Sequence, residues 1–339
     1  MRAIVLVGGF GTRLRPLTLS TPKQMLPLVD RPMLEWVLAG LGRHGIDEAI
    51  LSLGYRPEAF QAAYPDGTCA GVRLRYAVEP EPLDTAGAIG FAAADAGIDE
   101  RFVVVNGDVL TDLDVGALVA AHAADHERHG AEGTIALHRV DDPSAFGVVP
   151  TDDDGRVVAF VEKPPRDEAP TDLINAGTYV LEPSVLSRIE PGRKVSIERE
   201  VFPAMVADGA LFARDDGGAY WVDTGTPVQY LGSMLDLIDG RRGEQPAAVH
   251  PSAAVAPTAT VERSIVMARA RVGVKVDLRG SAILTGAIVQ NNALVEDSII
   301  GPKAVVGRGA RVTGGSVIGD GVVIEDMAVV DGRRIPEPE

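Results

Sequence analysis

Short apolar runs alternate with amphipathic stretches over the first 240 residues of the chain. The runs that we expect to form strands lie at 3–7, 48–53, 74–78 and 102–106, then at 134–140, 147–150, 157–160 and 176–181. The stretches that fit helices lie at 33–44, 84–96 and 234–238. Such alternation is typical of βαβ units around a largely parallel sheet. The pattern therefore predicts an α/β, Rossmann-like domain at 1–240, with a mixed, mostly parallel sheet.

A different period begins after a polar linker at 241–248. Apolar residues recur from Val249 to Val330 at steps of six, with three steps of five, and Leu278 and Leu284 are two successive positions of this series. A hexapeptide repeat of this kind is the signature of a parallel β-helix, whereas antiparallel strands would alternate at period two. We therefore predict a left-handed parallel β-helix of about five coils at 249–332.

Charge and composition exclude several classes of partner. The formal net charge of −16 argues against a nucleic-acid partner, because binding to nucleic acid depends on lysine and arginine. The single Cys69 cannot form an internal disulfide, and no apolar run approaches the roughly 20 residues of a membrane span. The chain also reaches its first glycine segment too early for a signal peptide. We expect a cytoplasmic protein with no membrane partner.

A Gly-Gly-Phe-Gly segment at 8–11 follows the first expected strand, and Arg13 and Lys23 follow it closely. Glycines allow backbone N–H groups to surround phosphate oxygens, and the cations offset the charge of a polyphosphate. The segment is neither a Walker A loop, which needs Gly-Lys-Ser/Thr, nor a dinucleotide fingerprint, which needs glycine where Leu14 stands. A plain glycine-rich turn is the alternative, but the cations in an acidic chain favour a nucleoside triphosphate site.

Further polar segments stand where other strands should end. They lie at 79–87, 106–108, 162–164, 175–177 and 221–225. With the stretches 174–179 and 196–203, they resemble the sugar-nucleotide pyrophosphorylase family of nucleotidyltransferases over nearly the whole chain. Within that family the resemblance is strongest to the mannose-1-phosphate guanylyltransferases (GDP-mannose pyrophosphorylases). It implies that a sugar 1-phosphate, here mannose 1-phosphate, attacks the α-phosphorus of a nucleoside triphosphate, here GTP. The products are a nucleoside diphosphate-sugar and pyrophosphate.

The resemblance also implies which residues act. The catalytic residues would be Arg13, Lys23, Asp108 and Asp223. The nucleotide would contact Leu6, Gly8, Gly9, Gly11, Thr12, Arg13, Lys23, Glu79, Gly87 and Asp108. The sugar phosphate would contact Gly147, Glu162, Lys163, Asn175 and Gly177. Of the cations, Arg13 would face the departing β- and γ-phosphates, and Lys23 the α-phosphate.

Two of these carboxylates, Asp108 and Asp223, are the implied ligands of Mg²⁺. This ion prefers oxygen ligands and is usually bound through one or two carboxylates and substrate phosphates. Taken alone, Asp108 would more simply be a polar residue in a turn at the end of a strand. The family pattern, which pairs it with Asp223, favours the metal site.

The choice of base is less sharply specified. Glu79 stands where guanylyl members of the family have glutamate, and a carboxylate can accept hydrogen bonds from N1 and N2 of guanine. Two positions depart from this pattern: Asp84 replaces the glycine of the family turn, and Gln24 resembles the thymidylyl members. If the backbone at position 84 needs a positive φ, aspartate tolerates it better than most residues. Transfer from dTTP or another triphosphate to glucose, heptose or cyclitol 1-phosphate is the alternative.

Three histidines at 122, 126 and 129 lie in a polar stretch that fits a helix. Their spacing permits a metal site, but no third ligand is apparent, and a solvated helix face is favoured.

Two other functions compete with nucleotidyl transfer. An acyltransferase would need a catalytic base, and the repeat region has no histidine after His250. A non-catalytic regulatory subunit would be expected to lack Arg13, Lys23, Asp108 or Asp223, and all four are present. We therefore expect the β-helix to serve assembly of a homo-oligomer or regulation.

Overall fold

The computed structural model describes residues 1–54 and 56–337, and the chain forms two compact units. One unit comprises Met1–Gly9 and Leu34–Trp221, and we call it the sheet unit. The other comprises Phe10–Met33 and Val222–Glu339, and we call it the repeat unit. The segment 10–33, which carries Arg13 and Lys23, thus belongs to the repeat unit.

A mixed ten-stranded sheet runs through the described part of the sheet unit, in the order β11-β10-β12-β7-β1-β4-β6-β5, with β9 paired to β12 and β13. Its strands are β1 (Arg2–Leu6), β4 (Glu48–Leu53), β5 (Thr68–Cys69), β6 (Val72–Val78), β7 (Phe102–Asn106), β9 (Gly133–Arg139), β10 (Gly147–Val148), β11 (Val161–Glu162), β12 (Leu173–Leu181) and β13 (Leu211–Asp215). The central strands β7, β1, β4 and β6 are parallel, which confirms the predicted α/β class.

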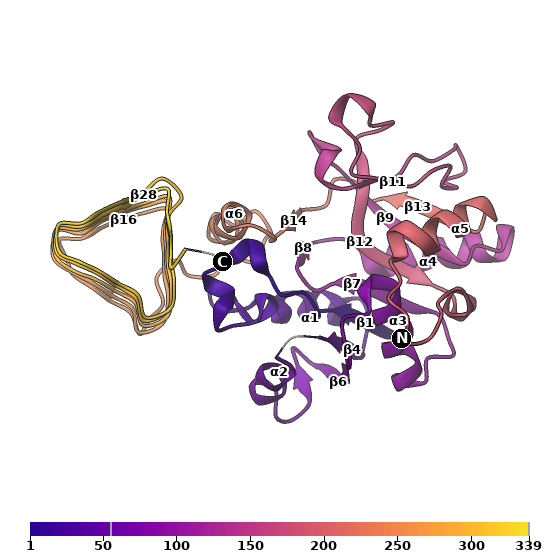
Figure 1. The fold of residues 1–339 in the computed structure, drawn as a ribbon, viewed down its shortest axis with the longest axis horizontal. Helices are drawn as coiled ribbons and strands as arrows, with labels where there is room; N and C mark the ends of the chain where they lie inside the picture. Colours follow the sequence, from indigo (N-terminus) through magenta and orange to yellow (C-terminus); the bar gives the residue numbers. More distant parts are fainter. Residues whose placement is uncertain (55, 338–339) are drawn as a thin grey trace. The chain divides into compact units, whose positions relative to one another are not determined.

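Five α-helices accompany this sheet in the described residues, and Figure 1 labels them. They are α1 (Met33–Arg43), α2 (Pro57–Ala63), α3 (Asp84–Ala96), α4 (Val115–His129) and α5 (Phe202–Ala207). Short helical turns are η4 (Pro143–Ala145), η5 (Arg166–Glu168), η6 (Pro183–Arg188) and η7 (Ile197–Val201). Helix α3 packs on β1, β4 and β6, and all of its alanines except Ala94 are buried. None of the described helices is long and apolar enough to cross a membrane.

One predicted strand of the sheet unit is wrong. In the stretch 157–160, Val157 forms only an isolated bridge with Thr151, and the strand β11 begins at Val161. Val157 is buried in the core while Val158 is 55% exposed, so the apolar letters alone did not show that the stretch forms no strand.

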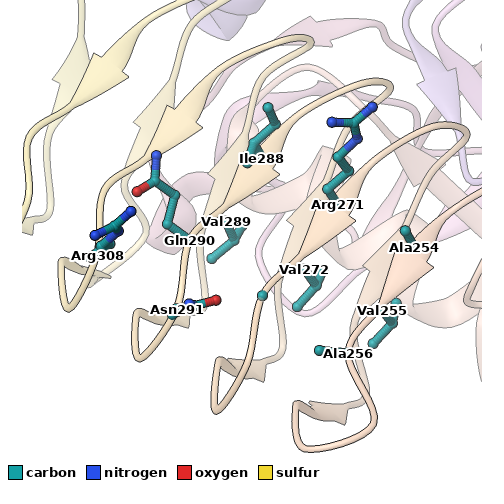
Figure 2. A pocket seen from close by; sticks show the side chains of 11 residues that line it. Ala254, Val255, Ala256, Arg271, Val272, Ile288, Val289, Gln290, Asn291 and Arg308 are labelled. Atoms are coloured by element: carbon teal, nitrogen blue, oxygen red, sulfur yellow. The ribbon is translucent and has the colours of Figure 1, made fainter.

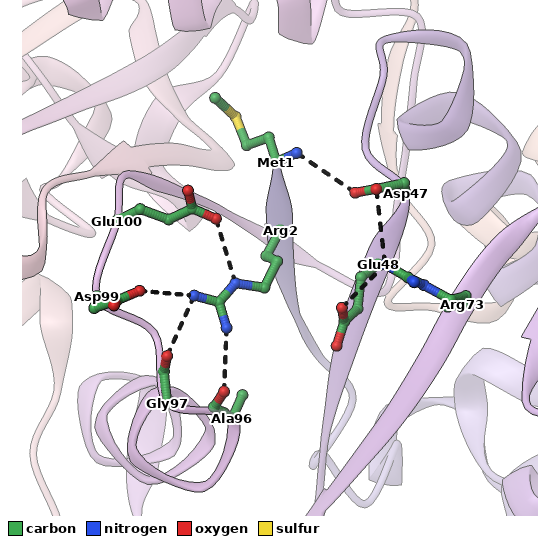
Figure 3. A network of polar contacts seen from close by, with 9 residues as sticks. All are labelled: Met1, Arg2, Asp47, Glu48, Arg73, Ala96, Gly97, Asp99 and Glu100. Atoms are coloured by element: carbon green, nitrogen blue, oxygen red, sulfur yellow. Dashed lines mark hydrogen bonds and ion pairs between the residues drawn. The ribbon is translucent and has the colours of Figure 1, made fainter.

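Arg2 joins the start of β1 to the end of α3 (Figure 3). Its Nη1 donates to the carbonyl oxygen of Ala96 at 3.1 Å, and its Nη2 donates to that of Gly97 at 3.2 Å. A cation at a helix C-terminus satisfies carbonyls that lack partners within the helix and interacts favourably with the helix dipole. The contact fixes the end of α3, whose first turn carries Asp84 and Gly87, against the start of the central strand β1.

The C-terminal part of the repeat unit is a parallel β-helix, seen as a triangle of stacked coils in Figure 1. Its first sheet contains β15 (Ala254–Val255), β18 (Arg271–Val272), β21 (Ile288–Val289), β24 (Val305–Val306) and β27 (Val323–Ile324). The second contains β16 (Thr260–Glu262), β19 (Asp277–Arg279), β22 (Leu294–Glu296), β25 (Arg311–Thr313) and β28 (Val329–Asp331). The third contains β17 (Ile265–Val266), β20 (Ala282–Ile283), β23 (Ile299–Ile300), β26 (Val317–Ile318) and β29 (Arg334–Ile335). The predicted hexapeptide β-helix is confirmed.

The register corrects one position of the predicted repeat. Ile283, and not Leu284, pairs with Val266 in the preceding coil and with Ile300 in the next. The sequence could not decide between them, because adjacent Ile283 and Leu284 are both apolar and both buried.

A column of serines follows one corner of the β-helix. Ser264, Ser281, Ser298 and Ser316 are buried, and the backbone N–H of each later serine donates to Oγ of the one before it, at 3.0 to 3.2 Å. Each hydroxyl donates in turn to a carbonyl of its own corner. The column satisfies buried polar groups that would otherwise be costly, and the sequence analysis did not identify it.

The third sheet of the β-helix is covered on its outer face. Ile265, Ala282, Ile299 and Val317 each precede a core residue in their strands, so they point away from the β-helix core, yet none is more than 1% exposed. Helix α6 (Pro227–Ile238) contacts β17, and the Tyr230 hydroxyl of α6 donates to the Pro27 carbonyl at 2.5 Å.

The segment 10–33 thus packs within the repeat unit through its own short elements. These are η1 (Thr12–Leu14), η2 (Leu17–Leu19), η3 (Lys23–Met25), β2 (Pro27–Leu28) and β3 (Arg31–Pro32). Two further strands are β8 (Val109–Thr111) in the sheet unit and β14 (Trp221–Asp223), which spans the junction of the two units.

Candidate active site

Two cations converge on one carboxylate in the repeat unit. Lys23 Nζ lies 3.7 Å from Asp223 Oδ1, and Arg13 Nη2 lies 3.9 Å from Asp223 Oδ2. The Lys23 side chain is 6% exposed and that of Arg13 is 65% exposed. Removal of one partner of a buried ion pair destabilises a protein strongly, because the remaining charge is left uncompensated. The structure therefore brings these three predicted residues together, with Lys23 held inside and Arg13 accessible to a bound anion.

Gly11 is required by the turn that carries these cations. Its φ is 61°, and a Cβ at this position would lie 3.0 Å from Thr18 Cγ2 and 3.2 Å from Lys23 Cβ. The Thr18 hydroxyl closes the turn by donating to the Gly11 carbonyl at 2.8 Å. Thr12 follows as the first residue of η1. The predicted glycine of this segment thus has a conformational reason as well as a possible phosphate contact.

A second glycine, Gly225, admits the guanidinium of Arg13. A Cβ on Gly225 would lie only 2.6 Å from Arg13 Nη2 and 2.9 Å from Asp223 Oδ1. Gly225 was not predicted as a site residue from sequence, although it follows Asp223 by two residues. Its role depends on contact with Arg13 of the distant segment 10–33, which the local sequence does not indicate.

Glu79 of the sheet unit is held at both carboxylate oxygens. The Ser52 hydroxyl donates to Oε1 at 2.9 Å, and the Leu83 N–H donates to Oε2 at 3.1 Å. Glu79 is 8% exposed, and a Cβ on Gly8 would lie 3.4 Å from Oε1, so two predicted nucleotide residues are neighbours. A carboxylate has about four lone-pair sites, so both oxygens can accept a further hydrogen bond. Ser52, inside an apolar strand, was missed from sequence.

The turn after Glu79 confirms the expectation for Asp84. Its φ is 61°, and its own Oδ1 accepts from the N–H of Thr85 at 2.9 Å. Nearby, a Cβ on Gly87 would lie 2.7 Å from the Arg193 carbonyl oxygen, and Gly87 N–H donates to Val195 at 3.1 Å. Close packing of α3 on the segment 193–195 thus accounts for this glycine.

The end of β1 meets the turn that holds Asp108. Leu6 pairs with Asn106 in the sheet, and Gly107 N–H donates to the Leu6 carbonyl at 2.9 Å. A Cβ on Gly107 would lie 2.9 Å from that oxygen, so the turn lies close against β1. Asp108 follows directly at the carboxyl edge of parallel strands, where open sheets bind ligands. Gly9, another predicted nucleotide-binding residue, follows the end of β1 and is exposed.

Asn175 and Gly177 form a bulge in β12. The pairing of β12 with β9 shifts between Asn175 and Tyr179, and Asn175 Nδ2 donates to the Tyr179 hydroxyl at 2.9 Å. Gly177 has a φ of 74°, and a Cβ there would lie 2.6 Å from Asn106 Nδ2. The bulge thus brings β12 against the end of β7. Bulges of this kind often re-aim side chains next to active sites.

Trp221 holds this bulge from outside the sheet, and the sequence analysis assigned it no role. Its Nε1 donates to the Ala176 carbonyl at 2.9 Å. Its ring stacks on His138 with centroids 5.1 Å apart and meets Phe146 edge-on at 5.6 Å. These aromatic contacts support the Asn175–Gly177 bulge from the side of β9 and β10.

The other predicted sugar-phosphate residues also lie together. Gly147 pairs with Glu162 across β10 and β11, and a Cβ on Gly147 would lie 3.1 Å from Glu162 Oε2. Lys163 Nζ lies 3.4 Å from Glu162 Oε1, and the Lys163 side chain is 59% exposed. Lys163 also has a φ of 49° and donates its N–H to the Phe146 carbonyl at 2.9 Å. An exposed ammonium is thus available to an anionic ligand.

The predicted metal ligands belong to different units, Asp108 to the sheet unit and Asp223 to the repeat unit. Among residues 1–54 and 56–337, no group of three histidine, cysteine, aspartate or glutamate residues could hold a metal ion. A magnesium ion bound by two carboxylates and substrate phosphates needs no such group. The oxygen ligands of the two aspartates fit that chemistry, and the pair stays a prediction.

The prediction of a solvated helix face is wrong for His122. This residue of α4 is fully buried, and its Nε2 donates to Glu182 Oε1 at 3.1 Å while Nδ1 accepts the Thr134 hydroxyl at 2.8 Å. A carboxylate can only accept, which fixes this tautomer. Burial and then the nearby Arg101 charge lower the pKa of His122 to about 4, against the opposing effect of Glu182. Hydrophobic periodicity could not reveal these partners, because Thr134 of β9 and Glu182, directly after β12, are distant in sequence from α4 or in another element.

A recess of about 500 Å³ lies on the first sheet of the β-helix (Figure 2). Its lining includes Arg271, Gln290, Asn291 and Arg308, together with apolar residues such as Ala254. None of the residues predicted to bind substrate lines it.

Comparisons with known proteins agree with the order of these elements. The nucleotidyl transferase family matches residues 2–240, and the family described as the GMPPB C-terminal domain matches residues 244–338. The mannose-1-phosphate guanylyltransferase of Mycobacterium tuberculosis is 45% identical, over 74% of this chain and 72% of the relative. The mannose-1-phosphate guanyltransferase of Schizosaccharomyces pombe is 41% identical, over 75% of this chain and 69% of the relative.

A solved structure is also similar. HddC from Yersinia pseudotuberculosis, complexed with GMP-PN, matches with a TM-score of 0.58 and 28% identity. The match covers 69% of this chain and 97% of that chain.

Proposed function

The chain belongs to the nucleotidyl transferase family, and we propose that it transfers a guanylyl group from GTP to mannose 1-phosphate, giving GDP-mannose and pyrophosphate. The relatives named above support these substrates. The observation that supports the chemistry most is the convergence of Lys23 and Arg13 on Asp223, directly after a glycine turn. Two anions must meet in this reaction, so fixed cations are what the chemistry requires.

In the proposed reaction an oxygen of the sugar phosphate attacks the α-phosphorus in line with the departing group. The new bond joins that oxygen to the α-phosphorus, and the bond between the α-phosphorus and the α–β bridging oxygen breaks. Lys23 would stabilise charge at the α-phosphate, and the exposed Arg13 would neutralise the pyrophosphate as it leaves. No side-chain nucleophile and no covalent intermediate are needed.

The acceptor would bind in the sheet unit. Lys163 would neutralise the sugar phosphate, because its ammonium is exposed beside Glu162. Glu162, Gly147, Asn175 and Gly177 would contact the sugar hydroxyls, with the bulge in β12 held by Trp221.

Members of this family generally use a divalent metal, and we propose Mg²⁺ held by Asp108 and Asp223. When bound, the ion would neutralise phosphate charge and orient the α-phosphate. Asp223 also holds the buried Lys23, so one carboxylate would organise both the ammonium and the ion.

Glu79 is the proposed reader of the base. Its oxygens are held by Ser52 and Leu83, so the carboxylate is preorganised to accept from N1 and N2 of guanine. Gln24, which resembles the thymidylyl members, is 3% exposed. Its burial favours a supporting role over direct contact with the base.

We further propose that residues 1–240 and 249–332 act as catalytic and assembly domains, and that the enzyme is a cytoplasmic homo-oligomer. Support for an interface comes from the last coil, where Val323, Met327 and Val329 are 60%, 74% and 69% exposed. Exposed apolar side chains at a sheet edge are typical of contacts between subunits.

The substrates are tested by pyrophosphate release across GTP, dTTP, ATP, UTP and CTP, each with mannose, glucose, heptose and cyclitol 1-phosphates. We expect the highest kcat/KM with GTP and mannose 1-phosphate. Glu79→Gln should lower kcat/KM for GTP about tenfold or more relative to ATP, because a hydrogen bond to a charged group is lost. Turnover only with another pair would reject these substrates and keep the reaction class, while equal losses for GTP and ATP would remove Glu79 as the reader.

A further inference from the structure

The final coil of the β-helix contacts the turn that carries Arg13. Arg334, the first residue of β29, donates from Nη1 to the main-chain carbonyl oxygen of Arg13 at 2.9 Å, across 321 positions of sequence. Both residues belong to the repeat unit. Arg13 lies in η1, a single helical turn whose last carbonyls have few partners of their own. A guanidinium is a strong donor for such an oxygen.

Two further contacts join the same coil to the same segment. Ser20 Oγ donates to Asp320 Oδ2 at 3.4 Å, and a Cβ on Gly319 would lie 3.1 Å from Pro16 Cβ. The segment from Arg13 to Ser20 therefore rests on the last coil at its beginning, middle and end.

The side chain of Arg13 is restrained separately from its backbone. Its guanidinium lies 3.9 Å from Asp223 Oδ2 and close to Gly225, both near the start of α6. The hydrogen bond from Arg334 goes to the main-chain carbonyl of Arg13. The Arg13 carbonyl is thus held by the β-helix, and the Arg13 guanidinium lies beside Asp223.

We propose that Arg334 is a positioning residue for nucleotidyl transfer, through which the last coil of the β-helix sets the place of the Arg13 guanidinium. This inference rests on the proposed function, because it assumes that Arg13 neutralises the departing pyrophosphate. It gives the β-helix a part in catalysis that acts through Arg13, in addition to the assembly role proposed above. Loss of the interaction between Arg334 and Arg13 should therefore impair the steps that involve the triphosphate and leave binding of the sugar phosphate unaltered.

The test compares Arg334→Met, which keeps the aliphatic stem, with Arg334→Lys, which keeps a donor. The matched control is Arg333→Met, because Arg333 is the neighbouring residue, is exposed and pairs with Glu337 at 2.8 Å. Steady-state constants for both substrates, melting temperature and oligomeric mass are measured on the full chain.

We expect Arg334→Met to lower kcat/KM for the triphosphate about five- to tenfold, with an unchanged KM for the sugar phosphate. Arg334→Lys should recover most of the loss, and Arg333→Met should match the wild type. In an Arg13→Met background, Arg334→Met should cause no further loss, because residues that act as a unit are not additive.

Three results would overturn the inference: wild-type constants in Arg334→Met, a full additional loss in the Arg13→Met background, or a loss that follows a change in oligomeric mass. The wild-type enzyme in the same assay tests the proposed function by itself. Absence of turnover there rejects the function, whereas wild-type turnover with an unaffected Arg334→Met rejects only the positioning role.

Discussion

Lys23 Nζ lies 3.7 Å from Asp223 Oδ1, so a nearly buried ammonium is held by a carboxylate 200 positions further along the chain. Both are predicted catalytic residues, and although they are far apart in sequence they belong to the same compact unit. Arg13 approaches the other oxygen of the same carboxylate. Asp223 therefore contacts both cations that we propose for nucleotidyl transfer, and a change at this residue should impair steps that involve the triphosphate more than binding of the sugar phosphate.

Asp223→Asn and Asp108→Asn should each lower kcat at least about 100-fold, because each removes a charge that would bind the metal and, for Asp223, hold Lys23. Asparagine has the same shape as aspartate, so Asp108→Asn should keep the melting temperature of the wild type. Asp223→Asn removes the carboxylate charge beside the nearly buried Lys23, so it should lower the melting temperature while the chain still folds. The measurement is kcat as a function of Mg²⁺ concentration. Asp66→Asn, in the exposed turn between α2 and β5, is the control and should behave as wild type. Full activity in either variant would remove that residue from the metal site.

Gly225→Ala should lower kcat about tenfold or more, because the new Cβ would lie 2.6 Å from Arg13 Nη2 and displace the guanidinium. Gly232→Ala is the matched control, since Gly232 lies in α6 with no atom within 4 Å of its added Cβ. It should keep full activity and gain slightly in stability. Equal activity of the two variants would contradict the assigned role of Gly225.

Asp84→Ala should lower the free energy of unfolding by about 1 kcal/mol, because alanine lacks the side chain that hydrogen-bonds Thr85 and would keep a Cβ at a φ of 61°. Asp84→Gly should stay within about 0.5 kcal/mol of wild type, since relief of the strained backbone offsets the lost hydrogen bond. Urea unfolding of the three proteins measures this order. If alanine were as stable as glycine here, the positive φ would not be maintained in solution.

His122 should make the protein less stable as pH falls. Its pKa is about 4 in the folded chain, where Arg101, Glu182, His126 and Thr134 surround it, against a usual value of 6.5. Below pH 6.5 His122 therefore binds a proton in the unfolded chain, whereas in the folded chain it binds one only near pH 4. Stability from this group is complete above pH 6.5, falls between 6.5 and 4 by up to about 3 kcal/mol, and then levels off.

The check is urea unfolding of wild type and His122→Gln between pH 7.5 and 4. Glutamine can still donate to Glu182 but does not titrate, so the difference between the two proteins should shrink as pH falls. The pKa of Glu182 is also lowered, since Arg101 and His122 outweigh its burial, and its contribution is lost in the same direction at lower pH. A difference that is constant across the range would contradict the lowered pKa of His122.

Elements whose residues mostly face the core could be predicted closely from sequence. The strands at 48–53 and 102–106 and the helix at 84–96 have the expected bounds, because each consists mainly of apolar or small residues, most of which the structure buries. The β-helix was predictable because one inward apolar position recurs in each of the three strands of every coil. Its exact register at Ile283 depended on hydrogen bonding between coils, which apolar letters do not encode.

The predicted site residues came from motifs, and the missed ones depend on contacts between distant segments. Ser52 acts through Glu79, Gly225 through Arg13, and Trp221 through the carbonyl of Ala176. Nothing in the local sequence of these residues signals such partners. His122 was misjudged for the same reason, since its buried position depends on Thr134 and Glu182.

The most direct test of guanylyl transfer uses mannose 1-phosphate labelled with ¹⁸O in its phosphate, together with unlabelled GTP and Mg²⁺. Mass spectrometry then follows the label into the products. Attack by the sugar phosphate on the α-phosphorus predicts that all of the label, including the oxygen that becomes the bridge, enters GDP-mannose while pyrophosphate stays unlabelled. Label in pyrophosphate or free phosphate, or no GDP-mannose when another pair of substrates turns over, would contradict the account.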